Sequence, residues 1–288
     1  MSCLIINADD FGLTSGVNRA ILELHEAGVL TSTTLMARAG ATNEALEKAR
    51  ETPTLGVGCH VVLVDGEPAL EATEIPTLVE RGTGSFRTSL GGFLARLFTG
   101  RISSAEIEAE AAAQIDLIQS KGLKLTHVDT HKHTHMFPAV LRPVLRAARA
   151  AGIGAVRNPF EPVWAVRATA GASWARAAQV NALRRLQARC RQIIAEEGFV
   201  TTDGTIAVVG TGVLDAGTVR SLLGQLPEGT WELVTHPGYN DADLDKVWTR
   251  LRASRGIEMG ALLAVREFRN IELISYGQLS AKVVSEAR

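Results

Sequence analysis

The sequence is poor in cysteine and carries almost no net charge. Its cysteines, Cys3, Cys59 and Cys190, are odd in number and widely separated. Such spacing favours neither a disulfide framework nor a Cys-x-x-Cys metal site, and it is typical of a reducing cytoplasm. The formal net charge is −1, so the positive excess of most nucleic-acid-binding proteins is missing and no nucleic-acid partner is expected.

Targeting segments and several catalytic signatures are also missing. Residues 1–7 contain neither a basic segment nor a long apolar run, so no secretory signal is expected. No stretch approaches about 18 uninterrupted apolar residues, which predicts no membrane span and supports a cytoplasmic location. The Gly-x-Ser-x-Gly motif of serine hydrolases, the His-Glu-x-x-His motif of zinc proteases and an opening phosphate-binding glycine loop are absent too.

What the sequence does contain is an alternation of strand-like and helix-like segments. Its 288 residues, 46% of them apolar, are enough for a large core and suit one α/β barrel of parallel strands, about seven or eight in number. The expected strands cover residues 3–8, 31–37, 55–63, 125–135, 155–156, 206–209, 231–235 and 271–275. The expected helices cover residues 15–27, 42–50, 103–121, 138–150, 173–197, 215–226, 244–254 and 258–265. Residues 1–288 are therefore expected to form a single domain, with a loop insertion near 65–90 and a helical insertion near 165–200.

A polar run in the middle of the chain contains four of the seven histidines within nine residues, 127–135. Every histidine and the single aspartate of this run stand at odd positions, so all five would face one way if the strand continued through it. A divalent cation would neutralise such a row; the alternative is a solvated loop or a row of hydrogen-bonded histidines. In a strand, His127 and His131 would lie about 13 Å apart, too far to share one ion. A metal site would therefore need ligands from elsewhere.

Two other expected strands supply such groups. Asp9 and Asp10 follow a buried strand, and because adjacent side chains point in opposite directions, the two acids should have different roles. An Asx turn that caps the next helix is the alternative. His60 lies alone in an apolar strand, where an isolated histidine is more often a core residue bonded to the backbone.

Two further strand ends carry functional candidates. Arg157 precedes a rigid Asn-Pro segment and could bind an anion or orient an acid; a surface ion pair with Glu161 is equally compatible with the sequence. His236 precedes Pro-Gly-Tyr, where it is either a site residue or an ordinary turn histidine. All these candidates fall at the carboxyl ends of strands, which is the face that carries the active site of such barrels.

The residue types at this face indicate metal-assisted hydrolysis of an amide or ester. Two histidines and one carboxylate leave positions on an ion open for water and substrate. The ion acidifies the water and polarises the carbonyl group. A second carboxylate can take the proton from the water, and a histidine can protonate the leaving group.

Four segments resemble the YdjC-like (ChbG/HpnK) carbohydrate deacetylases: Asn7-Ala8-Asp9-Asp10-Phe11-Gly12-Leu13, Gly58-Cys59-His60, His127-Val128-Asp129-Thr130-His131-Lys132-His133-Thr134-His135 and His236-Pro237-Gly238. The resemblance implies a deformed barrel related to polysaccharide deacetylases, and hydrolysis of an N-acetyl group from an amino sugar with one bound divalent metal. It implies the metal ligands Asp10, His60 and His131. It also implies Asp9 as general base and His236 as the acid or oxyanion partner.

Three further residues are expected to contact substrate: Arg157, His133 and Tyr239. Residues 157–159 also resemble the Arg-x-Pro segment of the polysaccharide deacetylases, in which the arginine holds the catalytic acid in place. A helical His-x-x-x-His pair would instead make His135 a ligand in place of His60. We favour His60 because the run before Pro138 looks extended and because the family pattern agrees. Mg or Zn is the favoured ion, and Mn or Co would also fit.

Substrate and partners are less closely defined. Lys132 and residues 157–162 resemble the branch linked to hopanoid glycolipids, so the substrate would be an oligosaccharide or a glycolipid. The basic face of residues 173–197 is compatible with contact to an anionic membrane surface, and the insertions hint at a homodimer. The rival interpretations are another metal-dependent hydrolase, such as a phosphoesterase with two ions, and a metal-containing sugar-binding protein without turnover.

Overall fold

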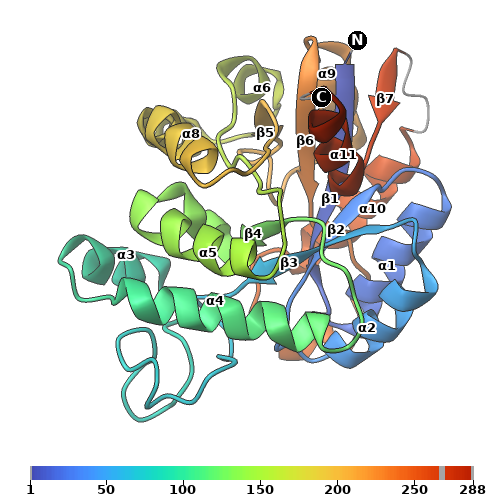
Figure 1. The fold of residues 1–288 in the computed structure, drawn as a ribbon. Coiled ribbons are helices and arrows are strands. Elements are labelled where there is room, and N and C mark those ends of the chain that lie inside the picture. Colours follow the sequence, from blue (N-terminus) through green and yellow to red (C-terminus); the bar gives the residue numbers. More distant parts are fainter. Residues whose placement is uncertain (1, 266–269, 287–288) are drawn as a thin grey trace.

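The structure is a computed structural model that describes residues 2–265 and 270–286, and a parallel sheet surrounded by helices forms its centre (Figure 1). The sheet has seven strands in the order β4-β3-β2-β1-β6-β5, and β7 also pairs with β1. The strands are β1 (Ser2–Phe11), β2 (Ser32–Leu35), β3 (Gly56–Val61), β4 (Val128–Thr130), β5 (Gly204–Ile206), β6 (Gly229–Thr235) and β7 (Ile271–Leu273).

The sheet curls into a deformed barrel. Beyond β4, Val128 forms a parallel bridge with Val156, and Ala155 forms another with Val200, just before β5. Parallel backbone pairing therefore continues from β4 to residues 155–156 and from there to residue 200, which leads into β5, the partner of β6. The predicted α/β barrel of parallel strands is confirmed.

Several helices begin at a capping side chain that the sequence supplies, whereas others, such as α2 and α10, have no side-chain cap. The Thr14 side chain accepts a hydrogen bond from Val17 N at the start of α1, and Ser103 accepts one from Glu106 N at the start of α4. The α-helices are α1 (Ser15–Glu26), α2 (Thr42–Glu51), α3 (Leu90–Phe98), α4 (Ser104–Gln119), α5 (Pro138–Ala150), α6 (Val163–Ala168), α7 (Trp174–Leu183), α8 (Gln187–Glu196), α9 (Ala216–Gly224), α10 (Arg252–Leu263) and α11 (Tyr276–Glu286). Short 3-10 turns are η1 (His131–Met136), η2 (Arg184–Leu186) and η3 (Leu244–Lys246).

Several expected boundaries are wrong. Of the helix expected over 244–254, residues 244–246 form the turn η3 and residues 252–254 begin α10, which continues through Gly256, where a helix end was expected. Tertiary contacts of buried α10 side chains outweigh the poor helix propensity of that glycine. The strand expected over 206–209 ends at Ile206, because Ala207 has a left-handed φ of 70°. Helix α3 was not expected, and the helix expected over 173–197 is divided into α7, η2 and α8.

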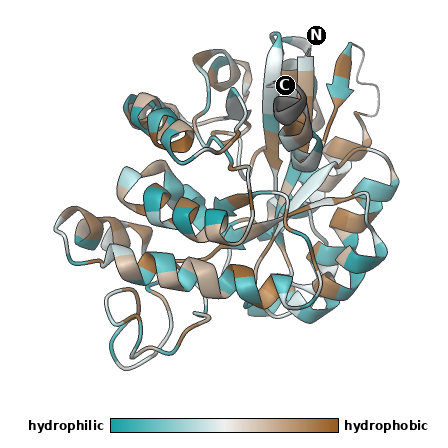
Figure 2. Ribbon diagram, viewed as in Figure 1, coloured by the Kyte–Doolittle hydropathy of each residue, from teal (hydrophilic) through white to brown (hydrophobic). Residues whose placement is uncertain are grey.

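The core lies inside the barrel and beneath the helices. Buried hydrophobic residues come from the strands and from the inward faces of the helices, and the surrounding helices mix hydrophobic and hydrophilic residues (Figure 2). Leu4, Ile5 and Ile6 are buried in succession, as expected for a parallel strand covered on both faces. No helix in the described residues is long and apolar enough to cross a membrane.

The loop between β3 and α3 is anchored by two acids of α4. The buried Glu110 carboxylate accepts hydrogen bonds from Ala69 N (2.7 Å) and Leu70 N (3.1 Å). Glu106 accepts one from Thr77 N at 2.7 Å. The two ends of the loop are also joined, since Asp65 N donates to the carbonyl of Arg87 and Phe86 N to that of Gly66. The loop is therefore held on the barrel although it has almost no regular secondary structure.

Candidate metal centre and its buried charge network

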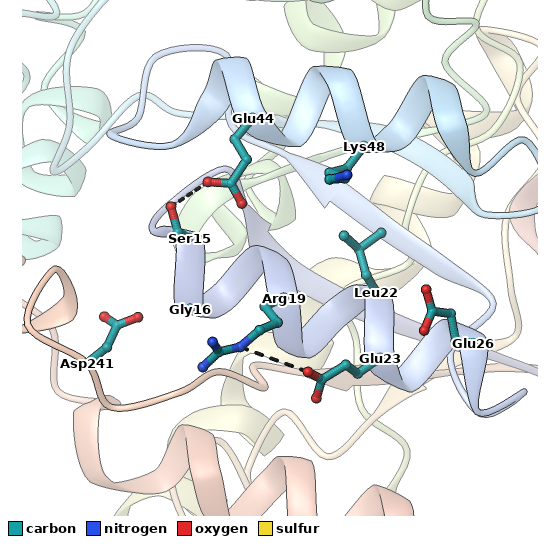
Figure 3. Close-up of a pocket in the computed structure, with 9 residues that line it drawn as sticks. All are labelled: Ser15, Gly16, Arg19, Leu22, Glu23, Glu26, Glu44, Lys48 and Asp241. Atoms are coloured by element: carbon teal, nitrogen blue, oxygen red, sulfur yellow. Dashed lines mark hydrogen bonds and ion pairs between the residues drawn. The ribbon is translucent and has the colours of Figure 1, made fainter.

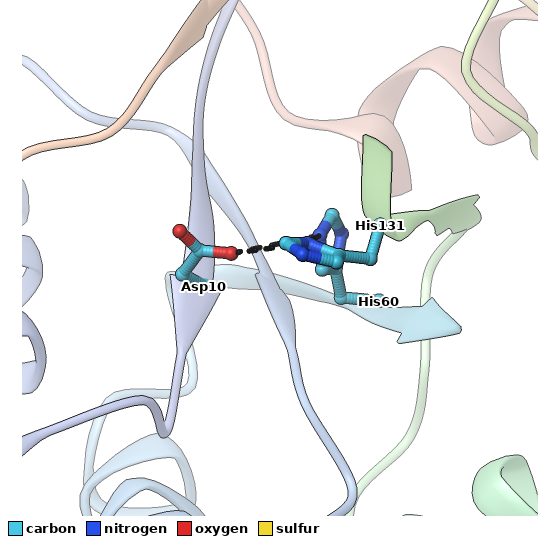
Figure 4. A group of neighbouring side chains, drawn as sticks. All are labelled: Asp10, His60 and His131. Atoms are coloured by element: carbon cyan, nitrogen blue, oxygen red, sulfur yellow. Dashed lines mark hydrogen bonds and ion pairs between the residues drawn. The ribbon is translucent and has the colours of Figure 1, made fainter. Parts of the chain in front are cut away.

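Three predicted ligands converge at the carboxyl ends of their strands. Asp10 comes from β1, His60 from β3 and His131 from the turn after β4 (Figure 4). Asp10 Oδ1 lies 3.7 Å from His60 Nε2 and 3.6 Å from His131 Nδ1, and the two ring nitrogens are 3.2 Å apart. One donor atom of each residue therefore faces a common point, and these atoms all lie within 4.8 Å of one another.

A second group of possible ligands, Asp9, His60 and Asp129, also lies within such distances. A guanidinium group already neutralises its carboxylates, because Arg157 donates to both Asp9 oxygens (2.9 and 2.6 Å) and forms an ion pair with Asp129. Both oxygens of Asp9 are thus already bonded to a cation, which disfavours a metal ion there. Asp10 also pairs with a guanidinium group, that of Arg255, but only through Oδ2, so its Oδ1 stays directed at the two imidazoles. The group of Asp10 with two imidazoles therefore fits a divalent ion better, and its nitrogen and oxygen donors suit Zn, Mn, Co or Mg.

The turn that carries His131 differs from the expected extended run. β4 ends at Thr130, and Lys132 and His133 have left-handed φ values of 56° and 50°. The Thr130 hydroxyl closes the turn, since it accepts a hydrogen bond from His135 N at 2.9 Å and lies 2.7 Å from His135 Nδ1. The expectation that the whole run faces one way is therefore wrong. His135 belongs to neither group of possible ligands in the described residues.

Asp9 lies beside the centre rather than in it. Asn7 Nδ2 donates to Asp9 Oδ1 at 3.1 Å, and His236 Nε2 lies 3.8 Å from Asp9 Oδ2. Burial and, to a smaller degree, the charge of Asp129 raise the pKa of Asp9, but Arg157 and His60 together outweigh them, so the net pKa is lowered. Asp9 is therefore an ionised, firmly held carboxylate with a histidine close to one oxygen.

Arg157 lies at the centre of a buried charge network, in which it pairs with three carboxylates. Its exposed fraction is 0%, and besides Asp9 and Asp129 it pairs with Glu232, whose carboxylate lies 2.7 Å away. Glu232 in turn accepts a hydrogen bond from the Tyr276 hydroxyl at 2.6 Å. The alternative of a surface pair with Glu161 is wrong. These contacts fit the role of steadying Asp9, and direct contact of Arg157 with substrate stays a prediction.

The other predicted residues lie at different distances from the centre. His236 donates its backbone N–H to Glu258 at 2.7 Å, and its ring reaches toward Asp9. The buried His133 Nδ1 has no hydrogen-bond partner among the described residues, and burial lowers the pKa of that ring well below its usual value. Tyr239 points away toward α1, where its hydroxyl donates to Glu23 at 2.5 Å and Arg19 covers its ring. Substrate contacts of His133 and Tyr239 stay predictions.

A cavity of about 410 Å³ lies near Tyr239, between α1 and α2 (Figure 3). Its lining residues are Ser15, Gly16, Arg19, Leu22, Glu23, Glu26, Glu44, Lys48 and Asp241. Figure 3 shows its acids and bases partly paired with one another, as in the ion pair of Arg19 with Glu23. None of the three predicted metal ligands lines this cavity, so it is separate from the centre.

Two important residues were missed from the sequence. Arg255 of α10 is buried and donates to Asp10 Oδ2 at 2.5 Å. Burial raises the pKa of Asp10, but Arg255 and then His131 lower it well below its usual value. Asp129 stands opposite His60 in the β3–β4 register and bonds its ring. The position of Asp129 in the polar run was a usable signal, whereas nothing near Arg255 in the sequence indicated a site.

His127 is expected to make the protein sensitive to acid. Its ring stacks on Tyr276 with centroids 3.9 Å apart, and burial lowers its pKa to about 3. An unfolded chain binds a proton at this histidine below about pH 6.5, so the stability from the neutral ring is present above that pH and is lost as the pH falls toward 3. Between pH 7 and 5, wild type should lose about 2 kcal/mol more unfolding free energy than His127→Gln.

Urea denaturation at the two pH values measures this difference. His25→Gln, which removes a partly exposed histidine of α1, is the control and should lose as much stability as wild type. Equal losses in wild type and His127→Gln would contradict the assignment.

The sequence profile of a family described as "YdjC-like protein" matches residues 3–270. A carbohydrate deacetylase of Thermoanaerobacter pseudethanolicus is 30% identical over 258 residues, which cover 90% of this chain and 89% of that protein. A carbohydrate deacetylase of Brevibacillus brevis is 43% identical over 145 residues, which are 50% of this chain and only about half (55%) of that relative.

Solved structures with the same fold are also known. A protein of Enterococcus faecalis V583, provisionally named a cellobiose-phosphate cleavage protein, is 26% identical and superposes with a TM-score of 0.76 over 96% of this chain and 98% of its own. A lactam utilization protein of Thermus thermophilus superposes with a TM-score of 0.53 at 15% identity, over 95% of this chain and 99% of its own, and shows a likeness of fold alone.

Proposed function

Because the chain belongs to the YdjC-like protein family, we propose that it is a metal-dependent hydrolase that removes an N-acetyl group from an amino sugar. The observation that carries the proposal is the convergence of Asp10, His60 and His131 beside a separate carboxylate, Asp9. The names of the Thermoanaerobacter and Brevibacillus relatives support the carbohydrate substrate.

Each residue of the centre has a role in this reaction. Asp10, His60 and His131 would hold the ion. A bound divalent ion would polarise the amide carbonyl and lower the pKa of water. Asp9 would accept the proton of the attacking water, and its pairing with Arg157 fixes the direction of its oxygens. His236, close to Asp9, would protonate the leaving amine nitrogen.

The rival hydrolase is a phosphoesterase, and a two-ion mechanism needs ions about 3.5–4 Å apart. Asp9 and Asp129, which lie beside His60, are the acids that could bind a second ion. Both already form ion pairs with Arg157. This disfavours the two-ion alternative. A sugar-binding protein without turnover remains the other rival, and an assay separates it.

Acetate release is expected from at least one member of a panel of free, oligomeric and lipid-linked N-acetylglucosamine compounds. Removing the metal with a chelator should abolish release, and adding back Zn, Mn, Co or Mg should restore it, because the proposed reaction needs the ion to polarise the carbonyl group and to lower the pKa of the attacking water. A coupled enzymatic acetate assay measures the result. Undiminished release after exhaustive chelation would refute metal dependence, and metal binding without release from any compound would favour the binding protein.

The panel also tests a narrower proposal, that the substrate is a lipid-linked sugar of the hopanoid type. Preference for the lipid-linked compound would support that branch, and preference for soluble oligosaccharides would exclude it. Cytoplasmic location, contact with an anionic membrane surface and a homodimer stay predictions. Vesicle sedimentation and sedimentation velocity would test the last two.

A further inference from the structure

We propose that Asp129 is a positioning residue that decides which nitrogen of His60 faces the metal. The proposal rests on the proposed function, because it assumes an ion at Asp10, His60 and His131. It assigns a role to a residue that is not a ligand. An imidazole has two nitrogens, and a hydrogen bond to one of them determines which is free to bind a metal.

The two nitrogens of His60 have different surroundings. Nδ1 lies 2.7 Å from Asp129 Oδ1, whereas Nε2 faces Asp10 and His131. Both side chains are buried, at 1% and 0% exposure, so water does not compete for the contact. An ionised carboxylate only accepts hydrogen bonds, so Nδ1 has to carry the proton in this contact. The lone pair of Nε2 is then the one that can bind an ion.

Asp129 cannot turn freely, because its other oxygen is also engaged. Arg157 forms an ion pair with Oδ2, and the Thr34 hydroxyl lies 3.3 Å from the same atom. His60 and Asp129 are direct neighbours in the β3–β4 register, which fixes the distance between their backbones. One carboxylate thus bridges an arginine, which always donates, and a histidine ring.

This bridge predicts the effect of an isosteric change. In Asp129→Asn the amide oxygen should turn to Arg157, because guanidinium groups have no acceptor. The amide NH₂ then faces His60 Nδ1, which has to accept. The ring proton is thereby moved to Nε2, where it blocks the metal position. The substitution should weaken metal binding although its shape is unchanged.

Calorimetric titration with Zn²⁺ in mildly alkaline buffer, where protons compete least for the imidazoles, tests this expectation. Asp129→Asn should bind about 10–100-fold more weakly than wild type. Glu232→Gln is the matched control, because Glu232 is another buried partner of Arg157 but bonds Tyr276 where Asp129 bonds His60. The control should bind nearly as tightly as wild type. Unchanged affinity in Asp129→Asn, or equal weakening in both variants, would overturn the proposal.

A measurement on the unaltered protein does not depend on how the variants fold. In ¹⁵N-histidine-labelled protein loaded with Zn²⁺, the His60 signals should show a proton on Nδ1 and coordination through Nε2. Coordination through Nδ1 would overturn the role of Asp129 and leave the proposed function standing. Failure of the wild-type protein to bind any divalent ion would instead remove the metal centre and both proposals with it.

Discussion

The Asp9→Asn variant is expected to keep its metal ion and to lose turnover by about 10³-fold. Asp9 is not one of the three converging ligands, so removing its charge leaves the donor set complete. An amide oxygen is far too weak a base to take the proton of the attacking water. Metal content by atomic emission and the rate of acetate release measure the two effects separately.

His131→Ala is the matched comparison, because it removes a ligand and should lose both metal and turnover. Circular dichroism of both variants has to show a folded chain, since Asp9 also bonds Arg157. If Asp9→Asn turned over at the wild-type rate, the base would have to be another group, and the proposed mechanism would fail.

Arg157→Met is expected to destabilise the protein by about 3–5 kcal/mol, because it leaves buried carboxylates without their positive partner. Asp9, Asp129 and Glu232 share this one guanidinium, and Asp129 and Glu232 have an exposed fraction of 0%. Without it, the pKa values of these acids should rise, so part of the lost stability should return as the pH is lowered. Chemical denaturation at several pH values measures this.

Arg146→Met removes an exposed ion pair with Glu108 and provides the control, with an expected loss of at most about 1 kcal/mol. A loss of the same small size in Arg157→Met would mean that water reaches the network. If the loss of unfolding free energy did not become smaller at lower pH, it would come from lost packing rather than from unpaired charge.

The features that could be predicted from the sequence follow from local chemistry. Parallel strands give continuous apolar runs, and the polar residues just after them meet at one face of the barrel. That rule placed Asp10, His60 and His131 together correctly. It said nothing about the backbone after Thr130, where a hydroxyl contact with His135 closes a turn that neither propensity nor periodicity reveals.

The features that could not be predicted are set by contacts between distant parts of the chain. Arg255 reaches Asp10 from a helix 245 residues later, and the same helix continues through a glycine that locally favours a break. The charge network around Arg157 joins strands whose polar members, such as Glu232, look unremarkable in sequence. These residues depend on the completed barrel, so only the folded arrangement identifies them.

The anchored loop between β3 and α3 has a practical consequence for protein engineering. Its ends meet at Asp65 and Arg87, so a shorter or foreign segment could be spliced between them without stretching the barrel. Replacing the loop would also remove the backbone amides that bond Glu110. Glu110 sits fully enclosed beneath the loop and satisfies its backbone amides, so it would have to be exchanged for an apolar residue in the same step.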